Sequence, residues 1–364
     1  MGKSADILKM IGSSSKTSTV IEPDIAVDNR VVYRPELVYG YEPNFVKGYK
    51  IRCGKHSIDE GVVGKAMVRN DHIRAVGPSG AGKSTLAGHE IDLLNAEVLK
   101  ENKIIHERNL PLIDVGAPVD KLEKYHELNY IGLVYNGHVG TTYEQMVGTL
   151  DLMYDEHGNR HAVRVPGFLS YAFTTPKVKL IWDEMDYTPA EALGAANIFL
   201  DGRTTSIDVF VNGKWTLRKQ DNFSVFATTN SLNGENQDEY AGVNPMNGAF
   251  SKRFNFIIHL DFLPEQQETD LLMKKFPTFR RDIAEQMVLS ANKTRVAKAS
   301  GAIEYELSTR ELCAWVRSCL DHPEQPVSRK EYWDKVADLY LYTSFLNRID
   351  SVSVRDGYAI YFTL

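Results

Sequence analysis

Cysteine is scarce in this sequence, which contains three cysteines and ten histidines among 364 residues. The cysteines form no C-x-x-C pair, which argues against a disulfide framework and a cysteine zinc site: Cys53, Cys313 and Cys319. Only His157 and His161 stand four residues apart, and the Gly-Asn pair between them favours a turn over a metal-binding helix. This composition suits a reducing compartment, so we expect a cytoplasmic location.

Long hydrophobic runs and an excess of positive charge are also lacking. No unbroken apolar run approaches the ~18–20 residues that a membrane span needs. Asp6 and Lys9 interrupt the short apolar run near the N-terminus, so we expect no signal peptide. The chain has 42 Lys and Arg against 48 Asp and Glu, a net charge of −6, which argues against a chain-wide surface for nucleic acid.

The most specific motif is a phosphate loop of the pattern G-x-x-x-x-G-K-S/T. Its nine residues are consecutive: Gly77, Pro78, Ser79, Gly80, Ala81, Gly82, Lys83, Ser84 and Thr85. Apolar residues 73–76 predict a strand before it, and helical spacing of apolar residues in 87–98 predicts a helix after it. Backbone N–H groups of such a loop face phosphates. We expect Lys83 to reach the β- and γ-phosphates of ATP and Ser84 to hold Mg²⁺; a plain glycine turn would not explain Lys-Ser here.

Two carboxylates follow the strand predicted at 177–182. In open parallel α/β sheets the ligand lies beyond the carboxyl ends of the strands, which places Asp183 and Glu184 beside the phosphate loop. We expect Asp183 to orient Mg²⁺ and Glu184 to polarise the attacking water. An acidic pair after a strand is common, but its order and distance after a phosphate loop favour this function. Lys179 interrupts the apolar run, which we explain by an edge strand or a side chain that reaches solvent.

A further strand, predicted at 223–230, ends in Asn230, whose amide is expected to hold the water or the γ-phosphate; the alternative is an ordinary turn residue. Other predicted strands lie at 130–135 and 255–260, a helix at 189–200, and hairpins at 150–165 and around residue 213. Residues from 264 onward are helix-rich, with Ser308-Thr309-Arg310 capping one helix. These elements predict an α/β fold: a five-stranded parallel sheet between helices, a hairpin insertion and a C-terminal helical lid.

The predicted organisation has four parts. Residues 1–20 form a flexible tail, 21–69 an extended arm on the core, 70–262 the α/β domain, and 263–364 the lid and C-terminal region. Residues 231–249 form a long Asn- and Gly-rich loop, and loops of this length are often functional or disordered.

The order of these motifs resembles the AAA+ ATPases. Within them the chain is similar to the MoxR-type clade and to the cobaltochelatase ATPase subunits (CobS), including relatives in phage genomes. The likeness covers roughly residues 35–320 and is carried by three runs: Asp183-Glu184-Met185-Asp186, Phe226-Ala227-Thr228-Thr229-Asn230 and Phe250-Ser251-Lys252-Arg253-Phe254.

The resemblance implies a ring, in this clade a hexamer, with ATP and Mg²⁺ between subunits. It makes Asp183 and Glu184 the Walker B pair, Asn230 the first sensor, Arg253 the arginine finger of the neighbouring site, and Arg310 the second sensor. An arginine so placed is worth about 10³–10⁵ in rate. The alternatives are a salt-bridged surface arginine for Arg253 and a solvated helix-start arginine for Arg310.

The resemblance also implies a function: an ATP-hydrolysing motor that remodels a partner protein, in this family one with a von Willebrand A-type domain. One alternative is a nucleic-acid motor resembling the GTP-using McrB, against which the net charge argues. Another is a ring that binds nucleotide only to assemble.

Overall fold

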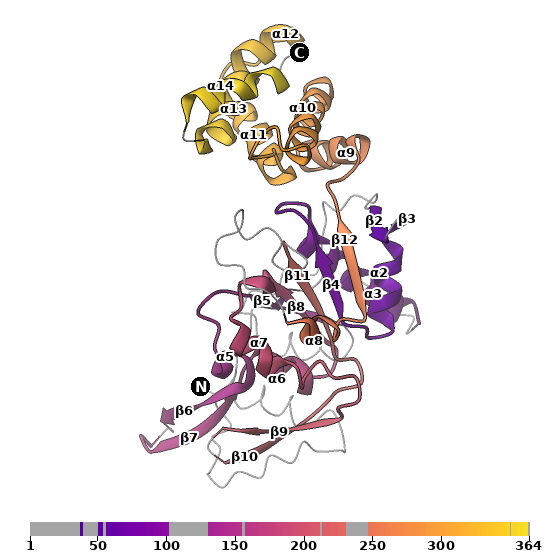
Figure 1. The fold of residues 1–364 in the computed structure, drawn as a ribbon, viewed down its shortest axis with the longest axis vertical. Helices are drawn as coiled ribbons and strands as arrows, with labels where there is room; N and C mark the ends of the chain where they lie inside the picture. Colours follow the sequence, from indigo (N-terminus) through magenta and orange to yellow (C-terminus); the bar gives the residue numbers. More distant parts are fainter. Residues whose placement is uncertain are drawn as a thin grey trace. The chain divides into compact units, whose positions relative to one another are not determined.

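The computed structural model describes residues 37–38, 50–53, 56–101, 130–154, 157–211, 213–230, 247–349 and 351–362. They form two compact units (Figure 1). The first contains the described residues of Met1–Glu42, Gly61–Val76 and Lys83–His259, and the second those of Pro43–Glu60, Gly77–Gly82 and Leu260–Leu364. The predicted tail 1–20 and the loop residues 231–246 lie outside the described residues.

The first unit is built on six strands of an eight-stranded sheet, in the order β1-β5-β8-β11-β4-β12. Neighbours from β5 to β12 are parallel, whereas β1 pairs antiparallel with β5. The five-stranded parallel sheet predicted from the sequence is therefore confirmed. Its strands are β1 Leu37–Val38, β5 Ile131–Asn136, β8 Val178–Asp183, β11 Ser224–Thr229, β4 Ile73–Val76 and β12 Phe256–Leu260.

Helices cover both faces of this sheet, which explains why its strands are apolar on both sides. Leu180 and Trp182 of β8 point into a core with α5 (Tyr143–Val147), α6 (Phe168–Thr174) and α7 (Ala190–Ala196). The alternate residues of β8 face α2 (Gly61–Val68) and α3 (Lys83–Glu101), which lie side by side in Figure 1.

Two expectations for the first unit need correction. Residues Gly61–Val68 are helix α2, whereas the sequence predicted an extended arm there. Helix α7 ends at Ala196, four residues before the predicted end at 200, and the chain continues as turns.

Both predicted hairpins are present in the first unit. Strands β6 (Gly148–Tyr154) and β7 (Arg160–Pro166) pair antiparallel, as do β9 (Ser206–Phe210) and β10 (Lys214–Arg218). Burial alternates along β9 and β10, so that one side of this hairpin joins the core.

The second unit is mainly helical and has a core of its own. Ile283, Met287 and Val336 are fully buried there. A short hairpin, β2 (Lys50–Cys53) with β3 (His56–Asp59), also belongs to it. Its helices are α9 Glu265–Lys275, α10 Arg281–Ala299, α11 Thr309–Leu320, α12 Arg329–Tyr332, α13 Asp338–Ser344 and α14 Val352–Tyr358, with a π-helical turn at Trp333–Ala337. None of the helices in the described part of the chain has the length and apolar content to cross a membrane.

Candidate active site

The phosphate-loop sequence stands between a strand and a helix, as predicted. Strand β4 ends at Val76 and helix α3 begins at Lys83. Gly80 and Gly82 have φ angles of 77° and 84°, a left-handed conformation that residues with a Cβ rarely adopt. The pattern of glycines therefore has a backbone cause, since the loop reverses direction at these two positions.

Four of the predicted site residues come together in the first unit. The Nζ atom of Lys83 donates a hydrogen bond of 2.9 Å to Oδ1 of Asn230. The hydroxyl of Ser84 donates one of 2.7 Å to Oδ1 of Asp183. Because β8 and β11 are parallel neighbours, their carboxyl ends meet at one edge of the sheet, beside the start of α3. A lysine, a hydroxyl, a carboxylate and an amide thus line the same edge.

Thr228 joins this group and was given no role by sequence reasoning. Its buried hydroxyl donates to Oδ1 of Asp183 and accepts a hydrogen bond of 2.9 Å from the backbone N–H of Glu184. One side chain therefore fixes both a carboxylate and the backbone of the next residue. Alternate side chains of a strand point to opposite faces of the sheet, so the sequence shows which residues share a face with Thr228. It places Thr228 beside Asp183 only once the register of β11 against β8 is known.

Glu184 has an unusual backbone conformation, with φ 50° and ψ 40°. Left-handed residues other than glycine concentrate at functional sites, where the surrounding structure holds the strain. Here Gly137 packs so closely that a Cβ at its position would lie 2.6 Å from the carbonyl oxygen of Glu184. The Gly137 N–H also donates 2.7 Å to the carbonyl of Asp183. The Glu184 side chain is exposed, so its carboxylate is accessible to solvent.

Two further buried charges support the same edge. Asp186 accepts a hydrogen bond of 2.8 Å from the backbone N–H of Asn230. The Arg74 guanidinium in β4 donates to Thr229 Oγ1 at 3.2 Å and to Ser251 Oγ at 3.3 Å. Burial lowers the pKa of Arg74 to about 10, and the negative charge of Asp186 opposes this shift. Arg74 therefore stays cationic at neutral pH; the sequence assigned no role to either residue.

Among the described residues, Arg253 makes no hydrogen bond or ion pair with Lys83, Ser84, Asp183 or Asn230. Its Nη1 atom forms an ion pair of 2.8 Å with Oδ2 of Asp201, and both side chains are partly exposed. Arg253 follows the short helix α8 (Gly248–Ser251). The salt-bridge alternative and a role toward a neighbouring subunit both fit this geometry.

Arg310 lies in the first turn of α11, in the second unit. Ser308 caps this helix, with a reciprocal pair of hydrogen bonds to Glu311, as the sequence predicted. A Cβ at Gly80 would lie 2.8 Å from Ser308 Oγ and 3.5 Å from Arg310 Cβ. Gly80 of the phosphate loop and the start of α11, both in the second unit, are therefore in direct contact.

Lys179 corrects a sequence expectation, because it lies neither on an edge strand nor in solvent. Strand β8 is internal to the sheet, and Lys179 is 1% exposed. Its ammonium donates to the carbonyls of Met67 and Asn222, at 3.2 and 3.0 Å, and to Asn70 Oδ1 and Ser224 Oγ, at 2.6 and 3.0 Å. Burial lowers the pKa of Lys179 to about 7.

Comparison with known proteins gives the family of this site. Residues 119–254 match the family model described as AAA domain (dynein-related subfamily). A stretch of 159 residues is 27% identical to the aerobic cobaltochelatase subunit CobS of Sinorhizobium sp. The chain contains an AAA+ ATPase domain related to CobS. Such a domain implies nucleotide binding and hydrolysis, and the predicted family is confirmed.

The matches to this AAA+ domain are partial. The stretch similar to CobS spans 42% of this chain and 46% of that protein, so the chain spans less than half the length of this curated relative. The family match begins after the phosphate loop, whose assignment rests on its own sequence and backbone.

Solved structures of RuvB from Thermotoga maritima also match. One mutant of RuvB is 14% identical, with a TM-score of 0.42, over 80% of this chain and 69% of that one. Another RuvB chain, described as a Holliday junction branch migration motor, is 12% identical with a TM-score of 0.40, over 77% and 64%. Similarity at this level gives no information on function.

Proposed function

We propose that this chain is a Mg²⁺-dependent ATPase that works as a hexameric ring and remodels a partner protein. One observation carries the proposal: the hydrogen bonds Lys83–Asn230 and Ser84–Asp183 place the start of α3 against the carboxyl ends of β8 and β11. A phosphate loop, an acid after one strand and an amide after the next are the parts needed to bind a triphosphate and activate a water.

The residues at this edge have oxygen groups suited to Mg²⁺. The Ser84 hydroxyl and the Asp183 carboxylate are in contact, and hard oxygen ligands of this kind are those that Mg²⁺ prefers. Ser84 and Asp183 would hold the ion, Asp183 through its water shell. When bound, Mg²⁺ supplies neutralisation of the charge on the β- and γ-phosphate oxygens.

The chain's own residues perform the remaining steps. The loop N–H groups of residues 77–85 bind the phosphates, and the Lys83 ammonium exchanges the Asn230 amide for the more strongly attracting γ-phosphate. Asn230 then orients the attacking water. Glu184 accepts a proton from that water as its oxygen attacks phosphorus, and the bond to the ADP oxygen breaks. Thr228 holds Glu184 and Asp183 in place for this step.

Two arginines, Arg253 and Arg310, complete the proposed set of residues for ATP hydrolysis. Arg253 enters the site of the neighbouring subunit and stabilises charge in the transition state, after releasing Asp201. The pair with Asp201 is partly solvated, and such pairs are weak, so its loss is compatible with this role. Arg310 acts from the start of α11 as the second sensor.

The proposed partner rests on the resemblance to the CobS-type ATPases. We propose that the partner is a protein with a von Willebrand A-type domain. We also propose that the two proteins interact in the cytoplasm of a bacterial or phage-infected cell. Metal insertion itself would belong to another subunit, because the described residues contain no group of three His, Cys, Asp or Glu suited to a metal.

A capture experiment tests the partner. The Glu184→Gln variant, which we expect to bind ATP without hydrolysing it, is used as bait in native lysate with ATP. Lys83→Ala is the control that should not load nucleotide. Recovery of a von Willebrand A-type protein with the first bait and not the second supports the proposal. Recovery of DNA or a nuclease, or GTP turnover without ATP turnover, would replace it with a nucleic-acid motor.

A further inference from the structure

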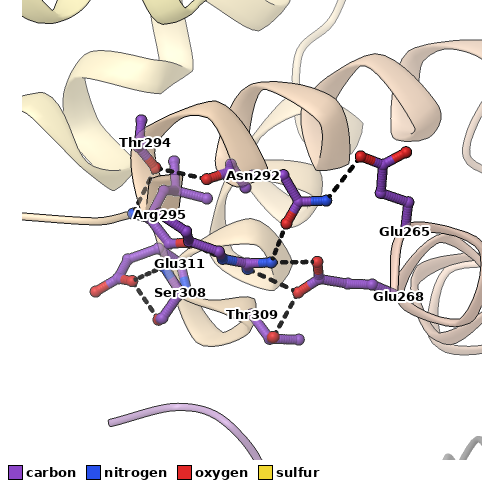
Figure 2. Close-up of polar contacts among 10 residues, drawn as sticks. Glu265, Glu268, Asn292, Thr294, Arg295, Ser308, Thr309 and Glu311 are labelled. Carbon is purple, nitrogen blue, oxygen red and sulfur yellow. Dashed lines mark hydrogen bonds and ion pairs between the residues drawn. The ribbon is translucent and has the colours of Figure 1, made fainter. Parts of the chain in front are cut away.

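A buried ion pair links α9 and α10 in the second unit (Figure 2). Arg295 donates to both carboxylate oxygens of Glu268, at 2.7 and 2.9 Å. Glu268 is fully buried, and the Arg295 side chain is 10% exposed. Arg295 also donates 2.8 Å to Asn292 Oδ1, and its guanidinium lies 3.9 Å from the centre of the Phe262 ring. This cation is therefore almost completely coordinated within the unit.

The same pair holds the chain that leads into α11. Arg295 Nε donates 3.0 Å to the carbonyl of Leu307, whose N–H donates 3.0 Å to Thr294 Oγ1. The hydroxyl of Thr309, the first residue of α11, donates to Oε1 of Glu268 (Figure 2). Both backbone polar groups of Leu307 and the side chain of Thr309 are thus fixed by α9 and α10. The ion pair therefore holds the residues on both sides of Ser308, the cap of α11.

The start of α11 also lies against Gly80, a phosphate-loop residue that belongs to the same unit. Ser308 and Arg310 lie against Gly80, close enough that a Cβ there would be 2.8 Å from Ser308 Oγ. The Arg310 side chain is exposed and has no hydrogen-bond or ion-pair partner within the described part of the chain. A shift of the first turn of α11 would therefore move a cation relative to the loop.

We propose that Glu268, Arg295 and Thr309 are positioning residues that hold Arg310 at the phosphate loop. The inference rests on the proposed ATPase function, in which Arg310 contacts the bound triphosphate. Glu268 neutralises Arg295, whereas Arg310 is exposed and has no ion-pair partner among the described residues, so its charge is available to the phosphates. Thr309 is the most informative of the three, because its hydroxyl connects Glu268 to α11, and its removal leaves both Arg295–Glu268 bonds in place.

The test is a double-mutant cycle on ATP turnover. Thr309→Val removes the hydroxyl and keeps the branched shape, and Arg310→Ala removes the cation. Misplacing a group that contacts the reacting phosphates is costly, so we expect Thr309→Val to lower kcat/KM by about tenfold. In the Arg310→Ala background the same change should have an effect of less than about twofold, because coupled residues are not additive. Thr309→Ser, which restores the hydroxyl, should recover turnover.

Thr343→Val is the matched control, since Thr343 is an exposed residue of α13 whose hydroxyl donates to the Tyr340 carbonyl of the same helix. Thermal unfolding of each variant shows whether the second unit stays folded. If the losses in kcat/KM caused by Thr309→Val and Arg310→Ala simply multiply in the double variant, the positioning role is wrong. It is also wrong if Thr309→Ser is no more active than Thr309→Val. Either result would leave the proposed ATPase function intact. A wild-type chain without ATP turnover would instead overturn the proposed function and this inference with it.

Discussion

Lys83 Nζ lies 2.9 Å from Oδ1 of Asn230 and donates a hydrogen bond to it, although the two residues are 147 positions apart in the sequence. The bond joins the lysine at the start of α3 to the residue that follows β11. Lys83 is buried, with 8% of its surface exposed. A triphosphate offers this ammonium a more strongly attracting anion than a neutral amide. The proposed function therefore predicts that ATP binding exchanges the partner of Lys83 and releases the Asn230 amide to orient the attacking water.

Asn230→Asp tests this exchange. The new carboxylate would lie beside the Lys83 ammonium in place of a neutral amide and would both compete with and repel the phosphates. We expect ATP affinity to fall by at least about tenfold, a change of about 1.4 kcal/mol in binding free energy. Titration with a fluorescent ATP analogue measures this. Asn347→Asp, at an exposed position, is the control, and equal affinities for the two variants would contradict the exchange.

Thr228→Val tests the support of the two acids. The substitution keeps the shape but removes the bond to Asp183 and leaves the N–H of Glu184 without its partner. We expect turnover to fall by about a hundredfold and the free energy of unfolding to fall by about 1–3 kcal/mol. Steady-state turnover and denaturant unfolding measure the two effects. Thr228→Ser should retain most activity, and a fully active valine variant would refute the role.

Because the pKa of the buried Lys179 is lowered, we expect the free energy of unfolding to depend on pH. Its pKa is about 7 in the folded chain and about 10.4 in an unfolded one, so between these values the unfolded state binds more protons. Stability from this group is therefore lowest below pH 7 and rises as the pH approaches 10. The difference in unfolding free energy between wild type and Lys179→Met should change over this window by an amount of the order of a few kcal/mol. Parallel curves from pH 6.5 to 10 would show that Lys179 titrates normally.

Variants of Arg253 and Asp201 test whether Arg253 is a catalytic arginine or only part of a structural ion pair. If Arg253 acts on a neighbouring site, Arg253→Ala should bind ATP but hydrolyse it about a thousandfold more slowly, whereas Asp201→Asn should stay active. Mixing Arg253→Ala with Glu184→Gln subunits should restore part of the turnover, because some sites then combine intact parts. Equal losses in Arg253→Ala and Asp201→Asn, without recovery on mixing, would indicate that the ion pair is only structural.

Much of the sheet edge could be predicted from sequence, because a phosphate loop and polar residues after apolar strands carry local signals. Asp183 and Asn230 were placed at the same edge simply because parallel strands align their carboxyl ends. The sequence signal for the helix cap at Ser308 is likewise local, because the cap is formed within four consecutive residues.

What could not be predicted depends on register and on contacts between distant residues. Thr228 and Asp186 become visible only when β8 and β11 are paired, and Arg74 only when β4 lies beside β11. Lys179 was misplaced because an apolar run with one lysine does not reveal the carbonyls and amide that satisfy it. The bounds of the predicted domains and the roles of the two arginines stay predictions.

The most direct test of the central claim compares phosphate release from ATP by the wild-type chain and by Glu184→Gln, with ATP affinity measured for both. Glu191→Gln, an exposed glutamate in α7, serves as the matched control. We predict Mg²⁺-dependent release by wild type and Glu191→Gln, and a loss of at least about a hundredfold in Glu184→Gln with unchanged ATP affinity. Turnover at the wild-type rate in Glu184→Gln would contradict the account.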